Sequence, residues 1–218
     1  MERRFRDSHA DKVVRLADRG RRPRFAAAAE VEAYWEALRG DRPMPDRGEI
    51  DPRGIEGALP HAVLLEPVAP GIARFRVAGT GLYRIMGMDV RGMPLSAFFL
   101  PEAREVLADT VRRVAGAPAA ATLTLRSPGR MGRAALDARL WLAPVRCPRL
   151  DTVRLLGCLE PEGDIGLAPR RFAIEHVRLR ATAEPDTQSR KGTGSPSGAP
   201  QRKSSAGRPA LRLVPSPA

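Results

Sequence analysis

Several kinds of residue are scarce in this sequence of 218 amino acids, and each scarcity argues against a class of protein. The two cysteines, Cys147 and Cys158, lie in apolar stretches, which is typical of buried thiols in a reducing compartment and not of a disulfide framework. The three histidines, His9, His61 and His176, are scattered and have no metal-ligand spacing. The sequence therefore predicts neither a disulfide-stabilised mini-protein nor a metal site.

Long apolar runs and catalytic motifs are also missing. No run approaches the roughly 18–20 residues that cross a bilayer, and the charged first 24 residues do not resemble a secretory signal. We find no nucleophile elbow, no phosphate-binding loop and no dinucleotide fingerprint, because the glycines of "VAGTGLYRIMG" are misplaced for the last of these. We therefore expect a cytoplasmic protein that is not an enzyme and does not contact a membrane.

Positive charge is plentiful, but it is concentrated at the two ends of the chain. The sequence has 37 Lys and Arg against 25 Asp and Glu, a net charge of +12. Residues 1–24 and residues 186–218 each have a net charge of +5, which leaves +2 for everything between them. Most basic residues are arginine and alanine is abundant, as a GC-rich genome produces. We do not expect specific nucleic-acid binding, and a nucleic-acid-associated protein that uses its basic ends is the alternative hypothesis.

An amphipathic helix and an irregular linker follow the basic first segment. In "FAAAAEVEAYWEALRG" the spacing i, i+3, i+4, i+7 places four large apolar side chains on one helical face, and Gly40 ends the helix. The next residues, up to Pro60, are so rich in proline and glycine that no long element can form. The apolar face of the helix is our candidate interface, with Trp141 of a later strand opposite it: Val31, Tyr34, Trp35, Leu38 and Trp141.

Five strands and one long helix are predicted in the following hundred residues. "HAVLLE" and "GIARFRVAGTG" form an antiparallel hairpin, in which Phe75 and Val77 point to the same face. Short helical turns follow, and then a helix over residues 101–116. Three more strands lie within residues 118–127, 134–145 and 152–162, whereas residues 169–180 fit either a strand or a helix.

This order of elements resembles a PAS domain, in particular the small single-domain PAS proteins of proteobacteria. The resemblance is carried by "AYWEALRGDRPMPDRGEIDP", "LPHAVLLEP" and "FRVAGTGLYRIMGMDVRGMPL", and it covers roughly residues 31–160. It implies an α+β fold, with a PAS-like five-stranded antiparallel sheet, short helices on one face and the N-terminal amphipathic helix on the other. The domain boundaries that we predict are a basic flexible arm (1–24), the helix and linker (25–60), the PAS-like domain (61–183) and a disordered basic tail (184–218).

The resemblance also implies a sensory or protein-interaction module in signal transduction, with a small cavity between the sheet and its helices. The partners that we expect are a small apolar metabolite, a signalling protein or a second copy of the chain. Flavin-binding PAS domains have a reactive cysteine and haem-binding ones a histidine on the long helix; neither is present here, so we expect no cofactor. A ligand-free core is the competing interpretation of the candidate lining, which is Phe75, Val77, Tyr83, Met86, Met88, Phe98, Leu123, Leu140 and Leu142.

Overall fold

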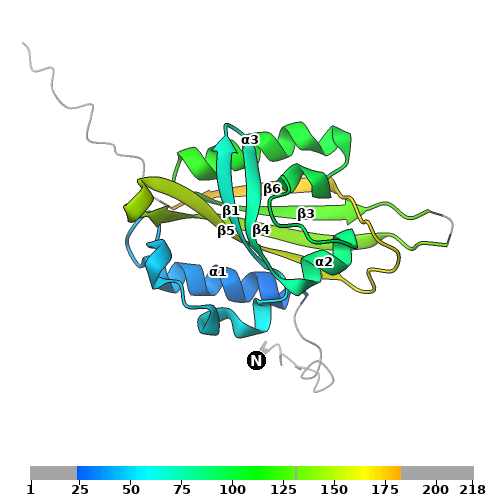
Figure 1. The fold of residues 1–218 in the computed structure, drawn as a ribbon, viewed down its shortest axis with the longest axis horizontal. Helices are drawn as coiled ribbons and strands as arrows, with labels where there is room; N and C mark the ends of the chain where they lie inside the picture. The colour runs from blue at the N-terminus through cyan, green and yellow to red at the C-terminus, as the bar shows by residue number, and fades with distance from the viewer. Residues whose placement is uncertain (1–23, 131, 183–218) are drawn as a thin grey trace, which may run out of the picture. The chain divides into compact units, whose positions relative to one another are not determined.

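The protein is described by a computed structural model, which places residues 24–130 and 132–182. The predictions of a basic arm and a disordered tail concern residues that lie almost wholly outside these ranges. Among the described residues the fold is α+β, with an antiparallel sheet in the order β2-β1-β5-β4-β3-β6 (Figure 1). The strands are β1 (Ala62–Ala69), β2 (Ile72–Ala78), β3 (Ala119–Ser127), β4 (Leu136–Cys147), β5 (Thr152–Glu162) and β6 (Ala173–Ala181).

Helices cover both faces of this sheet. Helix α1 (Ala26–Arg39) lies on one face, and α3 (Arg104–Gly116) lies on the other, together with α2 (Thr80–Met86) (Figure 1). Short 3₁₀ turns fill the connections: η2 (Arg47–Glu49), η3 (Pro52–Ala58), η4 (Leu95–Phe98), η5 (Pro101–Ala103) and η6 (Pro148–Leu150). None of the helices in the described part of the chain is long and apolar enough to span a membrane.

The sheet separates two hydrophobic cores, because successive side chains of a strand point to opposite faces. In β4, Leu140 and Leu142 belong to the inner core beneath α2 and α3, whereas Trp141 and Ala143 belong to the outer core beneath α1. Each of these four side chains is at most 1% exposed. The alternation of side chains along this strand decides which helix each residue meets.

The sheet has one strand more than the five that we predicted. Residues 173–181, which fitted either a strand or a helix, form β6, and this strand pairs antiparallel with β3. Val177 and Leu179 lie opposite Leu123 and Ala121, so their alternation places apolar side chains on the inner face of the sheet. The sheet therefore continues beyond β3 through this pairing with β6. The sequence pattern of residues 169–180 did not decide whether this pairing forms.

Candidate ligand-binding site

The interior cavity that the sequence suggested is occupied by packed side chains. Six of the nine candidate lining residues are buried in the inner core, and Tyr83 packs against its edge. The rings of Phe75 and Phe98 are in contact, with centroids 5.1 Å apart. The pockets described below lie elsewhere on the molecule. None of these pockets is lined by the six buried residues. These are Phe75, Met86, Phe98, Leu123, Leu140 and Leu142.

Val77 and Met88 were wrong as interior residues, since they are 54% and 56% exposed. The register of β1 with β2 shifts between Leu64 and Leu65, so that Val77 lies opposite Leu64 and Phe75 opposite Leu65. This bulge leaves an extra residue between Phe75 and Val77 and turns Val77 to the outer face. Met88 follows the end of α2, beyond Gly87 in a left-handed conformation, and is therefore directed away from the core.

The apolar stripe of α1 is buried against the outer face of the sheet within the chain. Val31 and Trp35 have no exposed area, and the indole ring of Trp35 meets that of Trp141 edge-on, with centroids 5.9 Å apart. The Trp35 Nε1–H donates to the carbonyl oxygen of Pro144 over 2.9 Å. Tyr34 and Leu38 are half-buried at the margin. The three buried side chains therefore have no surface left for a second copy of the protein while α1 stays docked.

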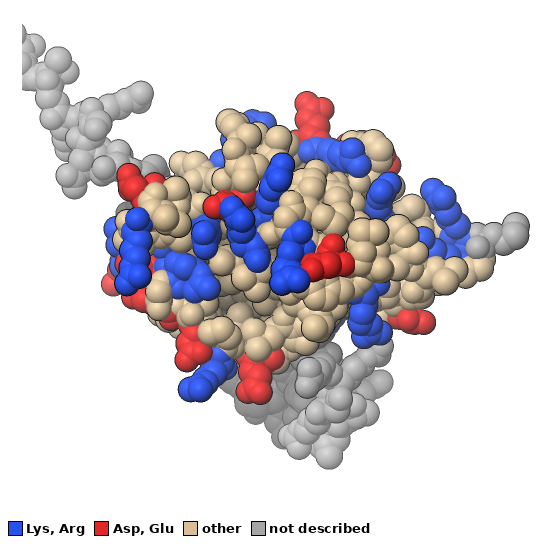
Figure 2. Space-filling model, in the orientation of Figure 1, with Lys and Arg blue, Asp and Glu red and all other residues tan. Residues whose placement is uncertain are grey.

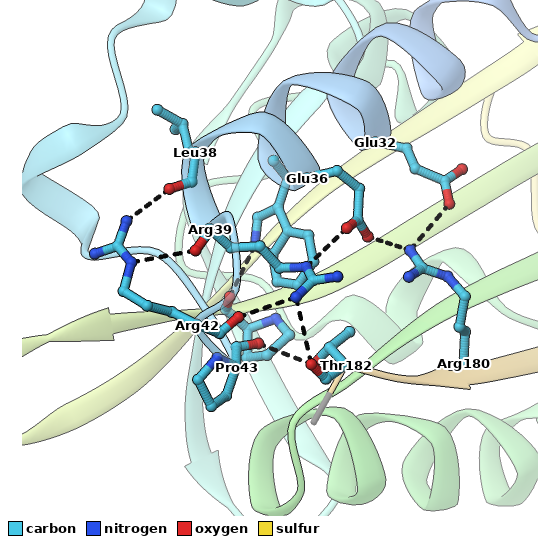
Figure 3. A network of polar contacts seen from close by, with 10 residues as sticks. Glu32, Glu36, Leu38, Arg39, Arg42, Pro43, Arg180 and Thr182 are labelled. Atoms are coloured by element: carbon cyan, nitrogen blue, oxygen red, sulfur yellow. Dashed lines mark hydrogen bonds and ion pairs between the residues drawn. The ribbon is translucent and has the colours of Figure 1, made fainter. Parts of the chain in front are cut away.

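A polar network fixes the C-terminal end of α1 to the edge of the sheet (Figure 3). Glu36 accepts hydrogen bonds from Arg180 of β6 and from Arg39 Nε, the latter over 2.7 Å. The hydroxyl of Thr182 donates to the carbonyl of Pro43 over 2.8 Å. Burial acts to raise the pKa of Glu36, but the hydrogen bonds from Arg180 and Arg39 together outweigh it and hold that pKa below its ordinary value. The end of β6 thereby helps to hold both α1 and the start of the linker.

The linker over residues 41–61 is fastened to α1 along its length. The hydroxyl of Tyr34 accepts from the backbone N–H of Asp51 over 2.8 Å and donates to its carbonyl over 3.1 Å. Glu30 accepts from the N–H of Gly57 over 3.1 Å. A Cβ atom on Gly54 would lie only 2.2 Å from the Tyr34 ring. The glycines of this segment thus allow close contact with the helix, and linker and α1 form one cover over the outer face.

The end of the linker meets the end of β2 in a contact that requires glycine. A Cβ atom on Gly79 would lie 2.1 Å from the carbonyl oxygen of Leu59, and one on Gly81 would lie 2.7 Å from that of Pro60. The N–H of Gly81 donates to the Pro60 carbonyl over 2.7 Å. The proline-rich linker and the "AGTG" turn, which are far apart in sequence, are therefore parts of one junction.

A pocket of about 260 Å³ opens between this linker and the outer face of the β1–β2 hairpin. Its lining is apolar apart from Arg47 at one side. Leu59 is 38% exposed and Val77 is 54% exposed, so two of its walls are open to a ligand. The side chains that define it are Ile50, Pro52, Ile55 and Leu59 from the linker, with Leu64 and Val77 from the sheet.

The linker residues of this pocket were missed at the sequence level. The prolines and glycines of residues 41–60 indicate only that no long element forms there. Ile50, Ile55 and Leu59 recur every four or five positions in that otherwise polar stretch, and this was the available signal that one side of it is apolar. The turn at Asp46 is also well defined, because Asp46 and Glu49 form a capping box and Arg146 pairs with Asp46 over 2.6 Å.

Comparison with known proteins identifies the family. A model of the PAS domain matches residues 24–160, which is more than half of the chain. The chain belongs to the PAS domain family. The matched range begins just before α1, so it includes the cover that α1 and the linker form over the outer face of this PAS domain. A search of curated proteins finds no significant match.

Three light-oxygen-voltage proteins are among the solved structures to which this chain is similar. The blue-light photoreceptor aureochrome1 domain in its dark state is 14% identical, with a TM-score of 0.37 over 50% of this chain and 80% of that one. A domain studied with a flavin analogue is 18% identical, with a TM-score of 0.36 over 51% and 84%. An RNA-binding light-oxygen-voltage receptor is also 18% identical, with a TM-score of 0.36 over 53% of this chain and 34% of that one.

The inner face of this PAS domain is closely packed. The aromatic and aliphatic side chains there are in contact with one another, and none of the pockets above lies among them. Cys158 lies in the outer core, and burial raises the pKa of its thiol. Cys147 ends β4 beside η2 and η6. Neither of the chain's two thiols therefore faces the inner core, and the expectation that no cofactor is bound stays a prediction.

Proposed function

We propose that this PAS domain is a cytoplasmic sensory module of signal transduction, which acts by binding and not by catalysis. Its ligand is a small apolar molecule that occupies the pocket between the linker and the β1–β2 hairpin. The observation that carries the proposal is the position of this pocket. One wall belongs to the sheet, and the other belongs to a segment that is bonded to α1.

Such a position couples occupancy to the outer cover of the domain. A ligand between Ile55 and Val77 touches the linker directly, and Tyr34 and Glu30 connect the linker to the exposed side of α1. A bound ligand then favours the position of the linker to which it binds most tightly. The shift in free energy equals the difference in its binding free energy between the two positions. Trp35 and Val31 anchor the buried side of the helix, so the expected movement is a shift of the linker and not release of α1.

Two arginine substitutions on β2 test this site. Val77→Arg places a long charged side chain at the pocket wall, whereas Ile72→Arg alters a residue of similar exposure, 47%, that does not line the pocket. Ligand-observed NMR with indole as the probe measures binding to each full-length variant. We expect saturable binding to the unsubstituted protein and to Ile72→Arg, and its loss in Val77→Arg. If indole does not bind, or binds equally to all three proteins, the proposal is refuted.

A further inference from the structure

A second pocket, at the end of the β3–β4 hairpin, is bordered by arginine side chains. It has a volume of about 330 Å³, and Arg130, Arg133 and Arg171 contribute to its lining together with Ser127. Two backbone hydrogen bonds, of 2.8 and 2.9 Å, join Arg130 and Arg133 and hold their backbones side by side. Arg171 comes from the segment that leads into β6. The hairpin tip, at the right of Figure 2, carries blue basic side chains.

These arginines are not neutralised by the carboxylates of the described residues. Arginine elsewhere on the domain is commonly paired, as in Arg24 with Asp137 or Arg146 with Asp46. Within residues 24–130 and 132–182, none of the three arginines of the pocket has a carboxylate oxygen within 4 Å. Like charges that are gathered without a counter-charge repel one another, and an anion between them relieves that repulsion.

A fourth arginine, Arg170, lies close to Arg133 and adds to the positive potential there. Arg170 is 1% exposed, and it donates to the carbonyl oxygens of Ile165 over 2.6 Å and Ala134 over 2.8 Å. Burial and the neighbouring Arg133 guanidinium lower the pKa of Arg170, and Asp164 opposes them only in part. These two carbonyl groups are neutral, so they accept from Nε and Nη1 of Arg170 without cancelling its charge. The buried charge of Arg170 therefore still acts on the pocket.

Two buried polar atoms at the pocket also have no hydrogen-bond partner among residues 24–130 and 132–182. One is the hydroxyl of Ser127, whose residue is 1% exposed, and the other is Nε of Arg133. A buried donor without a partner costs free energy, and native proteins rarely leave one unpaired. The other end of the Arg133 guanidinium is held by the carbonyl of Pro169, over 3.0 Å, so this side chain is already oriented. The unpaired groups are those that an oxyanion would bond.

We propose that this pocket binds a tetrahedral oxyanion, free or as the phosphate group of a small metabolite. Arginine binds such groups with paired, charge-assisted hydrogen bonds, and the serine hydroxyl supplies a further donor. The pocket has room for one phosphate group with a short organic body and not for a large ligand. Because the linker pocket is lined by different residues, this site is independent of the proposed function.

The experiment is a titration of the full-length protein with inorganic phosphate and, separately, with glycerol phosphate, at constant ionic strength in chloride. The melting temperature and calorimetric heats report binding. We expect saturable stabilisation, with an affinity that falls about tenfold in Arg133→Gln and in Arg171→Gln. Ser127→Ala should weaken binding by a smaller factor. Tighter binding of glycerol phosphate than of inorganic phosphate would identify a phosphorylated metabolite as the source, and the reverse order would identify the free anion.

The matched control is Arg53→Gln, which removes an exposed arginine of η3 that does not line the pocket. It should leave the affinity unchanged. Circular dichroism without ligand shows whether each variant is folded. If Arg133→Gln unfolds, Arg171→Gln still tests the pocket, because it changes an exposed side chain. The proposal is overturned if phosphate gives no saturable effect, or if Arg53→Gln weakens it as much as the pocket variants do.

Discussion

Trp35 and Trp141 meet edge to face beneath α1, and the indole N–H of Trp35 is bonded to the carbonyl of Pro144. An edge-to-face pair of this kind contributes about 0.5–1.5 kcal/mol beyond the burial of its area. The hydrogen bond satisfies two polar groups in an otherwise apolar layer. This contact holds α1 on the outer face of the sheet.

Trp35→Ala should lower the free energy of unfolding by about 3–5 kcal/mol, because it leaves a cavity and an unpaired carbonyl. Trp35→Phe keeps an aromatic ring but still leaves the Pro144 carbonyl without its donor, which costs about 1–3 kcal/mol. Urea denaturation measures both. Val68→Ala, on an exposed residue of β1, serves as the control and should change stability by less than about 0.5 kcal/mol. Equal effects of Trp35→Ala and Val68→Ala would contradict the docking of α1.

The ion pairs of Glu36 should make stability depend on pH in a narrow acidic range. The pKa of Glu36 in the folded protein lies below its ordinary value of 4.5, so its contribution is present above that value and is lost as the pH falls through the folded pKa. Arg180 is 39% exposed, and solvent screening limits the contribution to at most about 1 kcal/mol.

Denaturation of Glu36→Gln and the unsubstituted protein between pH 7 and pH 3 checks this. The difference in stability between the two should be largest near neutral pH and should disappear in acid, and high salt should reduce it. Glu56→Gln, which changes an exposed residue of η3, is the matched control. A difference that grows as the pH falls would show that the sign of the shift is wrong.

Cys158 should be unreactive in the folded protein, because its thiol is buried beneath α1 and burial raises its pKa. In Cys147→Ser it is the only thiol of the chain, so a thiol reagent such as Ellman's reagent reports on it alone. We expect slow labelling at pH 8 in the native state and rapid labelling in denaturant. Trp35→Ala should accelerate native labelling by loosening α1. Native labelling at the denatured rate would mean that α1 does not protect this residue.

Gly79→Ala should destabilise the fold although the backbone of Gly79 has ordinary angles. Its Cβ atom would overlap the carbonyl of Leu59, which is backbone and cannot rotate away, so we expect a loss of about 1–3 kcal/mol or more. Gly116→Ala, at the end of α3, meets no atom within 4 Å and should be neutral or stabilising by up to about 1 kcal/mol. Thermal unfolding separates them, and a neutral Gly79→Ala would exclude the tight junction.

Much of the local structure follows from short-range patterns. The spacing of Val31 and Trp35 predicts a helix with one apolar face, and the alternation around Trp141 predicts a strand with that ring on the face opposite to Leu140. Both are confirmed, as is the long helix that ends at Gly116. These predictions succeed because the periods of 3.6 and 2 are set by the backbone geometry of each element, whatever packs against it.

The position of the pockets was not predictable in the same way. A single bulge turns Val77 from the inner to the outer face, and nothing in the stretch "RFRVA" predicts this bulge. Likewise, the whole of β4 and β5 lies between Arg133 and Arg171 in the sequence, and only the return of the chain towards β6 places these two residues at one pocket.

Residue patterns along the chain are enough to predict α1, α3, the first five strands and the resemblance to PAS domains. The tertiary structure decided the sixth strand, the exposure of Val77 and Met88, and the gathering of arginines at the hairpin tip. The physical reason is the range of the interactions. The period of apolar residues reflects the local backbone geometry of one element. Strand register and pocket walls depend instead on which distant segments of the chain meet.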